Sequence, residues 1–463
     1  MAEKILFLTG KLAERQLKRI LKAMKPDFSY KINQIGVSVA ALMSENIIMR
    51  RVKVDETFNK IIIPGKFRGD LKKLSNYFQI PVERGPEDLT SLPDYFGMDN
   101  NETQLNESDC LIFAEIVDAT TLTVNEILTR AEEYRNDGAD VIDIGCMPDT
   151  EFSNLEEVIY KLKKSGHKVS VDSANYEELL RGGKCGADYL LSISEKNYDI
   201  LDSVDSIPVL IPSQPGDLKS LERIIRKTQS MNRDFLADPI LDPIHYGFVD
   251  SIVRYKKLRS MFPDIKILMG IGNLTELTDC DSVGVNTVLM GLVSELSVSA
   301  VLVVQVSNHC KNSIKETDQA RKLMYFAKKN QRLPVGIDES LMCLSNRRLF
   351  RQTKDEIDHF KLNVKDRNYR IMLTDKKINI FNKDVHLKGT DPYDFYNKLD
   401  VDNDSSHSFY LGVELARAQI ALQLYKNYNQ DNELNWGTSL KKDKVDLLKR
   451  PKLKSTQGKK NDN

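Results

Sequence analysis

LIFAEIVDATTLTVNEILTRAEEYRNDGADVIDIG, residues 111–145, is the stretch that decides the fold of this chain. It opens with an apolar run at 111–117, continues through a segment with helical spacing at 125–136, and ends in a second apolar run at 140–144. Short, nearly continuous apolar runs separated by helices are typical of parallel strands that are covered on both faces. The stretch therefore predicts one strand–helix–strand unit of an α/β fold.

The same unit repeats along the middle of the chain. Six further strand-like runs are KVSV (168–171), DYLLS (188–192), IPVLI (207–211), DFLA (234–237), KILM (266–269) and AVLVVQV (300–306). Eight such strands in about 225 residues match the size of a (β/α)₈ barrel. An open doubly wound sheet would have fewer strands and a glycine-rich first turn, whereas the first turn here is DATTLTVNE (118–126). We predict a TIM barrel over residues 109–336.

The chain on either side of this barrel predicts two smaller domains. Residues 1–108 alternate apolar runs with amphipathic stretches and predict an α/β domain that ends in a polar linker. Residues 337–440 predict a small α+β domain with two short strands at 369–373 and 378–381 and a long helix at 409–429. The remaining residues, 441–463, are basic and predict a disordered tail.

Composition excludes several classes of protein. The 67 Lys+Arg balance 67 Asp+Glu, so no net charge would attract nucleic acid or an anionic membrane. The apolar stretch at 283–306 is interrupted by polar residues and indicates a buried helix and strand rather than a membrane span. Six cysteines without a CxxC pair fit reduced thiols and no zinc site of standard spacing. The start of the chain lacks a signal-peptide core, so we expect a cytoplasmic location.

Polar residues follow most of the predicted strands, at the end of a TIM barrel where chemistry is placed. They are Asp118, Asp143, Asp172, Ser192, Asp238, Gly270, Asn273, Asn308 and His309. Several carboxylates without clustered Lys or Arg imply either a ligand that donates hydrogen bonds or a metal. Each aspartate taken singly could instead cap the helix that follows it.

Six of these strand ends also carry a family resemblance. They are IVDATT (116–121), ADVIDIG (139–145), VSVDS (169–173), LADPILDP (236–243), MGIGN (269–273) and VSNHC (306–310). In order and spacing they resemble the motifs of pterin-binding barrels, the dihydropteroate synthases and the pterin-dependent methyltransferases. The whole chain resembles the archaeal dihydropteroate synthase-like proteins, which carry additional amino-terminal and carboxy-terminal domains.

The resemblance implies a reduced pterin as ligand, of tetrahydromethanopterin or tetrahydrofolate type, and assigns no metal. A pterin presents N3–H beside an exocyclic amine, and a carboxylate can accept both. By position in the motif this acceptor is Asp238, with Asp242 in the following LDP as the alternative. Asp172 matches the acid on the other side of the ring, and Ser192 stands where the family has Asn. Asp118, Asp143 and Gly270 complete the expected pterin site.

The residues after the last two strands favour one reaction type. The synthases hold the pyrophosphate of their substrate with a Lys after strand seven and an Arg-x-His after strand eight. Here Asn273 replaces the Lys, and Asn308-His309 retains the His of this expected anion site but no Arg. In the methyltransferase branch an Asn at the position of Asn273 hydrogen-bonds N5 of a methyl-tetrahydropterin, so the resemblance favours methyl transfer.

Several alternatives remain open from the sequence. The chain could condense a pterin-methyl pyrophosphate with an arylamine, or bind a pterin without catalysis. Asn273 could cap a helix at 274–277. In the methyltransferase branch the methyl acceptor is a cobalt corrinoid on a separate protein, which would be a partner of this chain. The sequence also leaves open whether the chain forms a homodimer.

Overall fold

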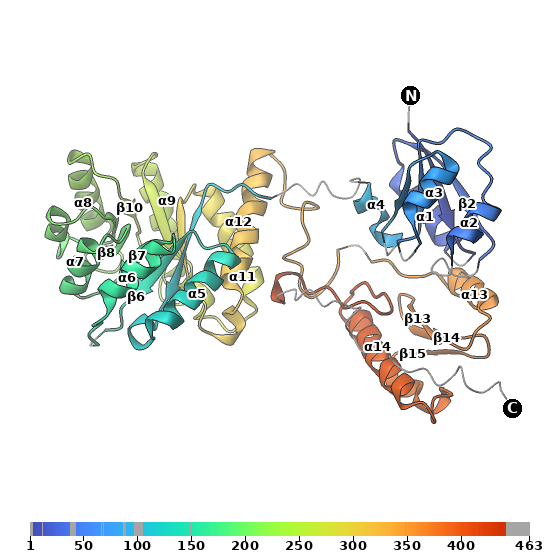
Figure 1. The fold of residues 1–463 in the computed structure, drawn as a ribbon. Coiled ribbons are helices and arrows are strands. Elements are labelled where there is room, and N and C mark those ends of the chain that lie inside the picture. The colour runs from blue at the N-terminus through green and yellow to red at the C-terminus, as the bar shows by residue number, and fades with distance from the viewer. Residues whose placement is uncertain are drawn as a thin grey trace. The chain divides into compact units, whose positions relative to one another are not determined.

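A computed structural model describes residues 3–440 except 12, 38–42, 66, 68, 87–88, 97–104, 149 and 348. Its internal contacts divide the chain into two compact units, shown in Figure 1. The barrel unit is Gln104–Leu341, and the flanking unit combines Met1–Thr103 with Met342–Asn463. The tail predicted at 441–463 lies outside the described residues.

The barrel unit contains a closed ring of eight parallel strands, which confirms the predicted α/β barrel. The strands are β5 (Leu111–Ile116), β6 (Val141–Gly145), β7 (Lys168–Asp172), β8 (Tyr189–Ile193), β9 (Ile207–Leu210), β10 (Leu236–Ala237), β11 (Lys266–Gly270) and β12 (Ala300–Val303). They follow one another around the ring in chain order, and the ring closes where β12 pairs with β5. The predicted apolar runs are therefore the strands of the barrel.

Helices surround this ring in Figure 1. They are α5 (Val124–Asp137), α6 (Leu155–Lys164), α7 (Tyr176–Lys184), α8 (Leu218–Ser230), α9 (Phe248–Met261), α10 (Gly272–Thr275), α11 (Ser282–Glu295) and α12 (Ser313–Lys329). A 3₁₀ turn (Tyr198–Asp202) takes the place of a helix between β8 and β9. The apolar stretch at 283–306 forms most of α11 and all of β12. No helix in the described part of the chain is long and apolar enough to cross a membrane.

The apolar side chains of the barrel strands pack in two separate layers. Ile112, Ile142 and Val171 belong to the large layer between strands and helices. Phe113 and Tyr189 belong to a smaller layer inside the ring, where their ring centroids lie 4.8 Å apart. Side chains alternate along a strand, so the residue two positions beyond Phe113 on β5 also faces the interior, nearer the carboxyl end of the strand. This alternation directs several polar side chains into the barrel.

The amino-terminal part of the flanking unit is a parallel sheet with strand order β2-β1-β3-β4, which fits the predicted α/β pattern. Its elements are β1 (Lys4–Thr9), α1 (Glu14–Met24), β2 (Ser29–Gln34), α2 (Glu45–Arg51), β3 (Lys60–Ile63), α3 (Leu71–Phe78), β4 (Val82–Arg84) and α4 (Leu92–Tyr95). The short helix α4 lies inside the segment predicted as a linker. It is folded because Leu92 is buried and the Phe96 ring lies 4.6 Å from that of Phe28.

The carboxy-terminal part of the flanking unit contains an antiparallel sheet of three strands. Its elements are α13 (Lys354–Asn363), β13 (Arg370–Leu373), β14 (Ile378–Phe381), β15 (His386–Gly389) and α14 (Ser405–Gln423). Helix α14 begins and ends earlier than the predicted 409–429. Asp404 caps its start by accepting from the His407 backbone N–H, and Tyr425 adopts a left-handed φ of 53° just beyond its end.

Candidate functional site

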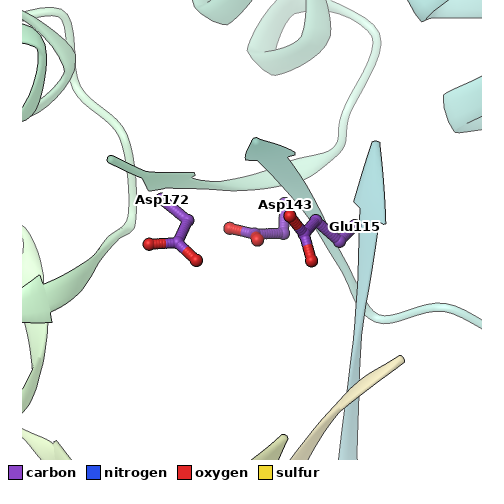
Figure 2. Close-up of side chains that lie close together, drawn as sticks. All are labelled: Glu115, Asp143 and Asp172. Atoms are coloured by element: carbon purple, nitrogen blue, oxygen red, sulfur yellow. The ribbon is translucent and has the colours of Figure 1, made fainter. Parts of the chain in front are cut away.

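Three acidic side chains from neighbouring strands meet inside the barrel, as Figure 2 shows. They are Glu115 of β5, Asp143 of β6 and Asp172 of β7, and one carboxylate oxygen of each lies within 4.8 Å of the others. Glu115 pairs with Asp143 across the strands, which puts both side chains on the interior face. Gly145 makes room for them, because a Cβ there would lie 2.8 Å from Glu115 Oε1. We call these three residues the carboxylate cluster.

Two serine hydroxyls orient the carboxylate cluster. Ser170 Oγ donates a hydrogen bond to Asp143 Oδ1, and Ser192 Oγ donates one of 3.2 Å to Asp172 Oδ1. The Asp143 side chain has no exposed surface, and its Oδ2 has no hydrogen-bond partner among the described residues. A buried carboxylate oxygen that accepts no hydrogen bond is energetically unfavourable. A ligand that contacts Asp143 Oδ2 would therefore be stabilised there.

Burial raises the pKa values of all three cluster residues, and repulsion by neighbouring carboxylates adds to the shifts of Glu115 and Asp143. Burial, with the Asp172 charge, raises the pKa of Glu115 to about 7. Burial, followed by the charges of Asp172 and Glu115, raises the pKa of Asp143 well above its usual value. Burial also raises the pKa of Asp172, against the hydrogen bond from Ser192. Within the described ranges no Lys or Arg forms an ion pair with any of the three, so their charges are uncompensated by the protein.

Asp238 follows strand β10 and is fixed from two sides. Its Oδ1 accepts a hydrogen bond of 2.6 Å from the Tyr255 hydroxyl of α9 and one of 2.7 Å from the Ile240 backbone N–H. Burial raises the pKa of Asp238 to about 6, although both hydrogen bonds oppose the shift. The charge of Asp172 contributes to the same shift, so Asp238 and the carboxylate cluster share one electrostatic environment.

Asp242, the alternative pterin acceptor, is held differently. Arg254 of α9 donates to Asp242 Oδ2 at 2.5 Å and also to the Ile240 carbonyl at 2.9 Å and the Pro239 carbonyl at 3.2 Å. The Asp242 carboxylate is therefore already neutralised by a largely buried ion pair. Of the two aspartates, Asp238 is the one whose side chain forms no ion pair with a described residue.

Asn273 lies just after Gly270, at the carboxyl end of strand β11. It is the second residue of α10, and its side-chain Nδ2 donates a hydrogen bond of 2.9 Å to the Leu241 carbonyl. The cap position of α10 is Ile271, so the alternative in which Asn273 caps the helix at 274–277 is wrong. The helix begins two residues earlier than that alternative requires, and the amide is directed to the loop after β10 instead.

The remaining predicted residues lie at other positions around the barrel mouth. Asn308 and His309 form a 3₁₀ turn after β12, where His309 Nε2 lies 3.2 Å from the Thr275 carbonyl. Asp118 follows β5 but forms an ion pair of 2.5 Å with Arg130 of α5. The structure therefore brings Asp143, Asp172 and Ser192 together, and places Asp118 against a helix.

Sequence reasoning missed two residues of this site. Glu115 could have been found, because a lone acid inside the apolar run LIFAEIV (111–117) is costly unless it has a role. Tyr255 gives no such signal, because a tyrosine on an amphipathic helix is common and its contact with Asp238 arises only in the folded barrel.

Two stretches of the chain match families of known proteins. Residues 115–209 match the family described as pterin binding enzyme, and residues 3–87 match a family of unknown function, DUF6513. An uncharacterised protein of Methanocaldococcus jannaschii is 28% identical, over 93% of this chain and 99% of that protein.

Solved structures similar to part of this chain include two dihydropteroate synthases. That of Yersinia pestis with a pterin–sulfa conjugate is 15% identical, with a TM-score of 0.39 over 48% of this chain and 94% of that chain. That of Coxiella burnetii with pteroic acid is 19% identical, with a TM-score of 0.38 over 48% of this chain and 94% of that chain.

Proposed function

Because its barrel is a pterin-binding barrel of the dihydropteroate synthase-like type, we propose that this protein is a transferase that takes a methyl group from a reduced pterin. The pterin is of tetrahydromethanopterin or tetrahydrofolate type, and the acceptor is a cobalt corrinoid carried by a separate protein. The placement of Asn273 carries the proposal.

Asn273 offers a neutral amide at the point where the pterin N5 would react. Its Nδ2 is engaged by the Leu241 carbonyl, which fixes the amide plane and leaves Oδ1 as an acceptor. Methyl transfer is easier when N5 gains a proton, because an amine leaves far better than an amide anion. An oxygen that accepts from the protonated N5 stabilises that state, and a positioned group of this kind contributes about 10²–10⁴-fold.

Asp238 supplies the recognition of the pterin edge. A carboxylate has about four acceptor positions, and Tyr255 and Ile240 take two of them at Oδ1. The two that remain are both on Oδ2, which can accept from the two neighbouring donors of the pterin, N3–H and the exocyclic amine. Asp172, close enough for its charge to affect Asp238, serves the other side of the same ring.

The expected anion site argues against pyrophosphate chemistry. The Glu276 carboxylate accepts hydrogen bonds from the backbone N–H groups of Val306 at 2.8 Å and Ser307 at 2.9 Å, in the loop that follows β12. Burial opposes ionisation of Glu276, but these hydrogen bonds hold its pKa below the usual value. A negative side chain thus uses donors that a phosphate would need, beside Asn308 and His309.

The test compares two reactions on the full-length protein. In the first, methyl-tetrahydromethanopterin or methyl-tetrahydrofolate is mixed with cob(I)alamin, and loss of the Co(I) absorbance is followed. The N5–CH₃ bond breaks, a Co–CH₃ bond forms as Co(I) becomes Co(III), and N5 takes a proton. In the second, a pterin-methyl pyrophosphate and an arylamine are mixed, and pyrophosphate release is followed. We expect turnover only in the first; turnover in the second alone would establish the synthase reaction instead.

A further inference from the structure

The carboxylate cluster has the dimensions of a metal site. Its three oxygens, one each from Glu115, Asp143 and Asp172, lie within 4.8 Å of one another. Oxygen ligands of one cation lie about 2.0–2.6 Å from it, so their mutual separations reach at most about twice that distance. For Mg²⁺, with ligands at about 2.0–2.1 Å, that limit is about 4.2 Å, so small rotations of the three side chains suffice to bring one oxygen of each onto a single ion.

Asp143 provides an observation that points to a ligand independently of this spacing. Its side chain is completely buried, yet Oδ2 lacks any partner among the residues that the structure describes. The other oxygen, Oδ1, is satisfied by Ser170. Figure 2 shows the Asp143 carboxylate between those of Glu115 and Asp172, so the unpartnered oxygen belongs to a carboxylate in the middle of the cluster.

The surroundings of the cluster are those of a hard-cation site. The hydroxyls of Ser170 and Ser192 hold one oxygen of Asp143 and one of Asp172, as neighbouring donors do for metal-binding carboxylates. Gly145 leaves the space into which Glu115 Oε1 extends. Carboxylate oxygens without His or Cys select Mg²⁺ or Mn²⁺ over softer metals.

We propose that Glu115, Asp143 and Asp172 bind one divalent cation of the Mg²⁺ or Mn²⁺ type inside the barrel. Three protein oxygens leave positions of an octahedral ion for water or for an oxygen of a bound ligand. The cation would relieve the repulsion among three carboxylates that form no ion pair with any Lys or Arg that the structure describes. This site does not depend on the proposed methyl transfer.

The experiment titrates metal-stripped, full-length protein with Mn²⁺ in the absence of any pterin. Binding is followed by the loss of the free Mn²⁺ electron paramagnetic resonance signal, and Mg²⁺ is then added as a competitor. We expect one Mn²⁺ per chain, displaced by Mg²⁺, together with a rise in melting temperature as the metal concentration increases.

Two variants locate the ion and one serves as a control. Asp143→Asn and the less disruptive Glu115→Gln should each weaken Mn²⁺ binding by roughly tenfold or more, the order found when a metal site loses a supporting group. Glu178→Gln is the matched control, because Glu178 is a buried acid bonded to Ser173 and outside the cluster, and it should leave Mn²⁺ affinity unchanged. The proposal is overturned if folded wild-type protein does not bind Mn²⁺ at millimolar metal. It is also overturned if folded Asp143→Asn and Glu115→Gln bind Mn²⁺ as tightly as the wild type does.

Discussion

Tyr255 and Asp238 are joined by a hydrogen bond of 2.6 Å that runs from a helix of the barrel to the loop after its shortest strand. Tyr255 is completely buried, so this bond forms away from solvent. Together with the Ile240 backbone N–H, it fixes one oxygen of Asp238 and thereby the direction of the other. The proposed pterin acceptor is therefore held in place before any ligand arrives.

Removal of the Asp238 carboxylate should weaken pterin binding strongly. Asp238→Ala leaves two donors of the pterin without partners in a buried site, a loss of roughly 2–5 kcal/mol. Asp242→Ala should cost much less, because Asp242 is already paired with Arg254. Calorimetric titration with a tetrahydropterin checks both variants. The reverse order of losses would move the acceptor to Asp242, and no loss in either would remove the pterin site from this end of the barrel.

Pterin affinity should depend on pH through Asp238. The free protein has a pKa of about 6 at this residue, and only the ionised form accepts both pterin donors. Affinity should therefore be level above pH 7 and fall about tenfold per unit below pH 6. Asp238→Asn should remove this dependence.

The Tyr255→Phe variant should also change the pH dependence of pterin affinity. The Tyr255 hydrogen bond lowers the pKa of Asp238, so its loss should move the midpoint to higher pH. Fluorescence titrations from pH 5 to 8 measure both profiles. A Tyr255→Phe midpoint at or below that of the wild type would contradict the role assigned to this bond.

Asn273 should affect turnover more than binding. Its interaction with N5 strengthens only as the methyl group leaves, so Asn273→Ala should keep pterin affinity within about tenfold and lower methyl transfer about a hundredfold, or about 2.7 kcal/mol. Single-turnover rates with cob(I)alamin give the second quantity. Asn273→Ser is the control: its hydroxyl is too short to span from the Leu241 carbonyl to N5, and full activity in it would show that the amide has no part in the reaction.

Pyrophosphate should not compete with pterin. Glu276 occupies backbone donors of the loop after β12, and His309 without an accompanying Arg contributes no fixed charge. Millimolar pyrophosphate should leave the apparent pterin affinity unchanged in a competition titration. Glu276→Gln, which removes the negative charge, is the matched variant in which weak competition is expected. Strong competition in the wild type would favour the synthase reaction.

The barrel was predictable because each strand is an apolar run, and every strand except β8 is separated from the next by an α-helix. Strand β2, SYKINQ, was not predicted, because most of its residues are polar and none of them is buried. Strand β15 was missed for a similar reason, since only its last residue, Gly389, is buried. Edge strands of this kind obtain their stability from backbone pairing, which leaves little pattern in the sequence.

The site was predictable only in part, for a related reason. Asp143 lies two residues before the end of β6 and Asp172 ends β7, so both could be placed towards the barrel mouth from chain order alone. The pairing of Asp242 with Arg254 depends on how the loop after β10 folds back on α9, and the sequence does not specify that path. The role of Glu276 likewise depends on a contact between two loops, which only the closed barrel provides.

The discontinuous chain of the flanking unit has a consequence for synthesis on the ribosome. Arg19 and Glu356, which form an ion pair of 3.0 Å within that unit, are separated by 337 positions. At about 5–20 residues per second, roughly 20–70 s pass between the emergence of the first partner and that of the second. During this interval the whole barrel is translated. The amino-terminal sheet must therefore persist through barrel synthesis without its carboxy-terminal complement, and a chain truncated after the barrel would leave the surface around Arg19 uncovered.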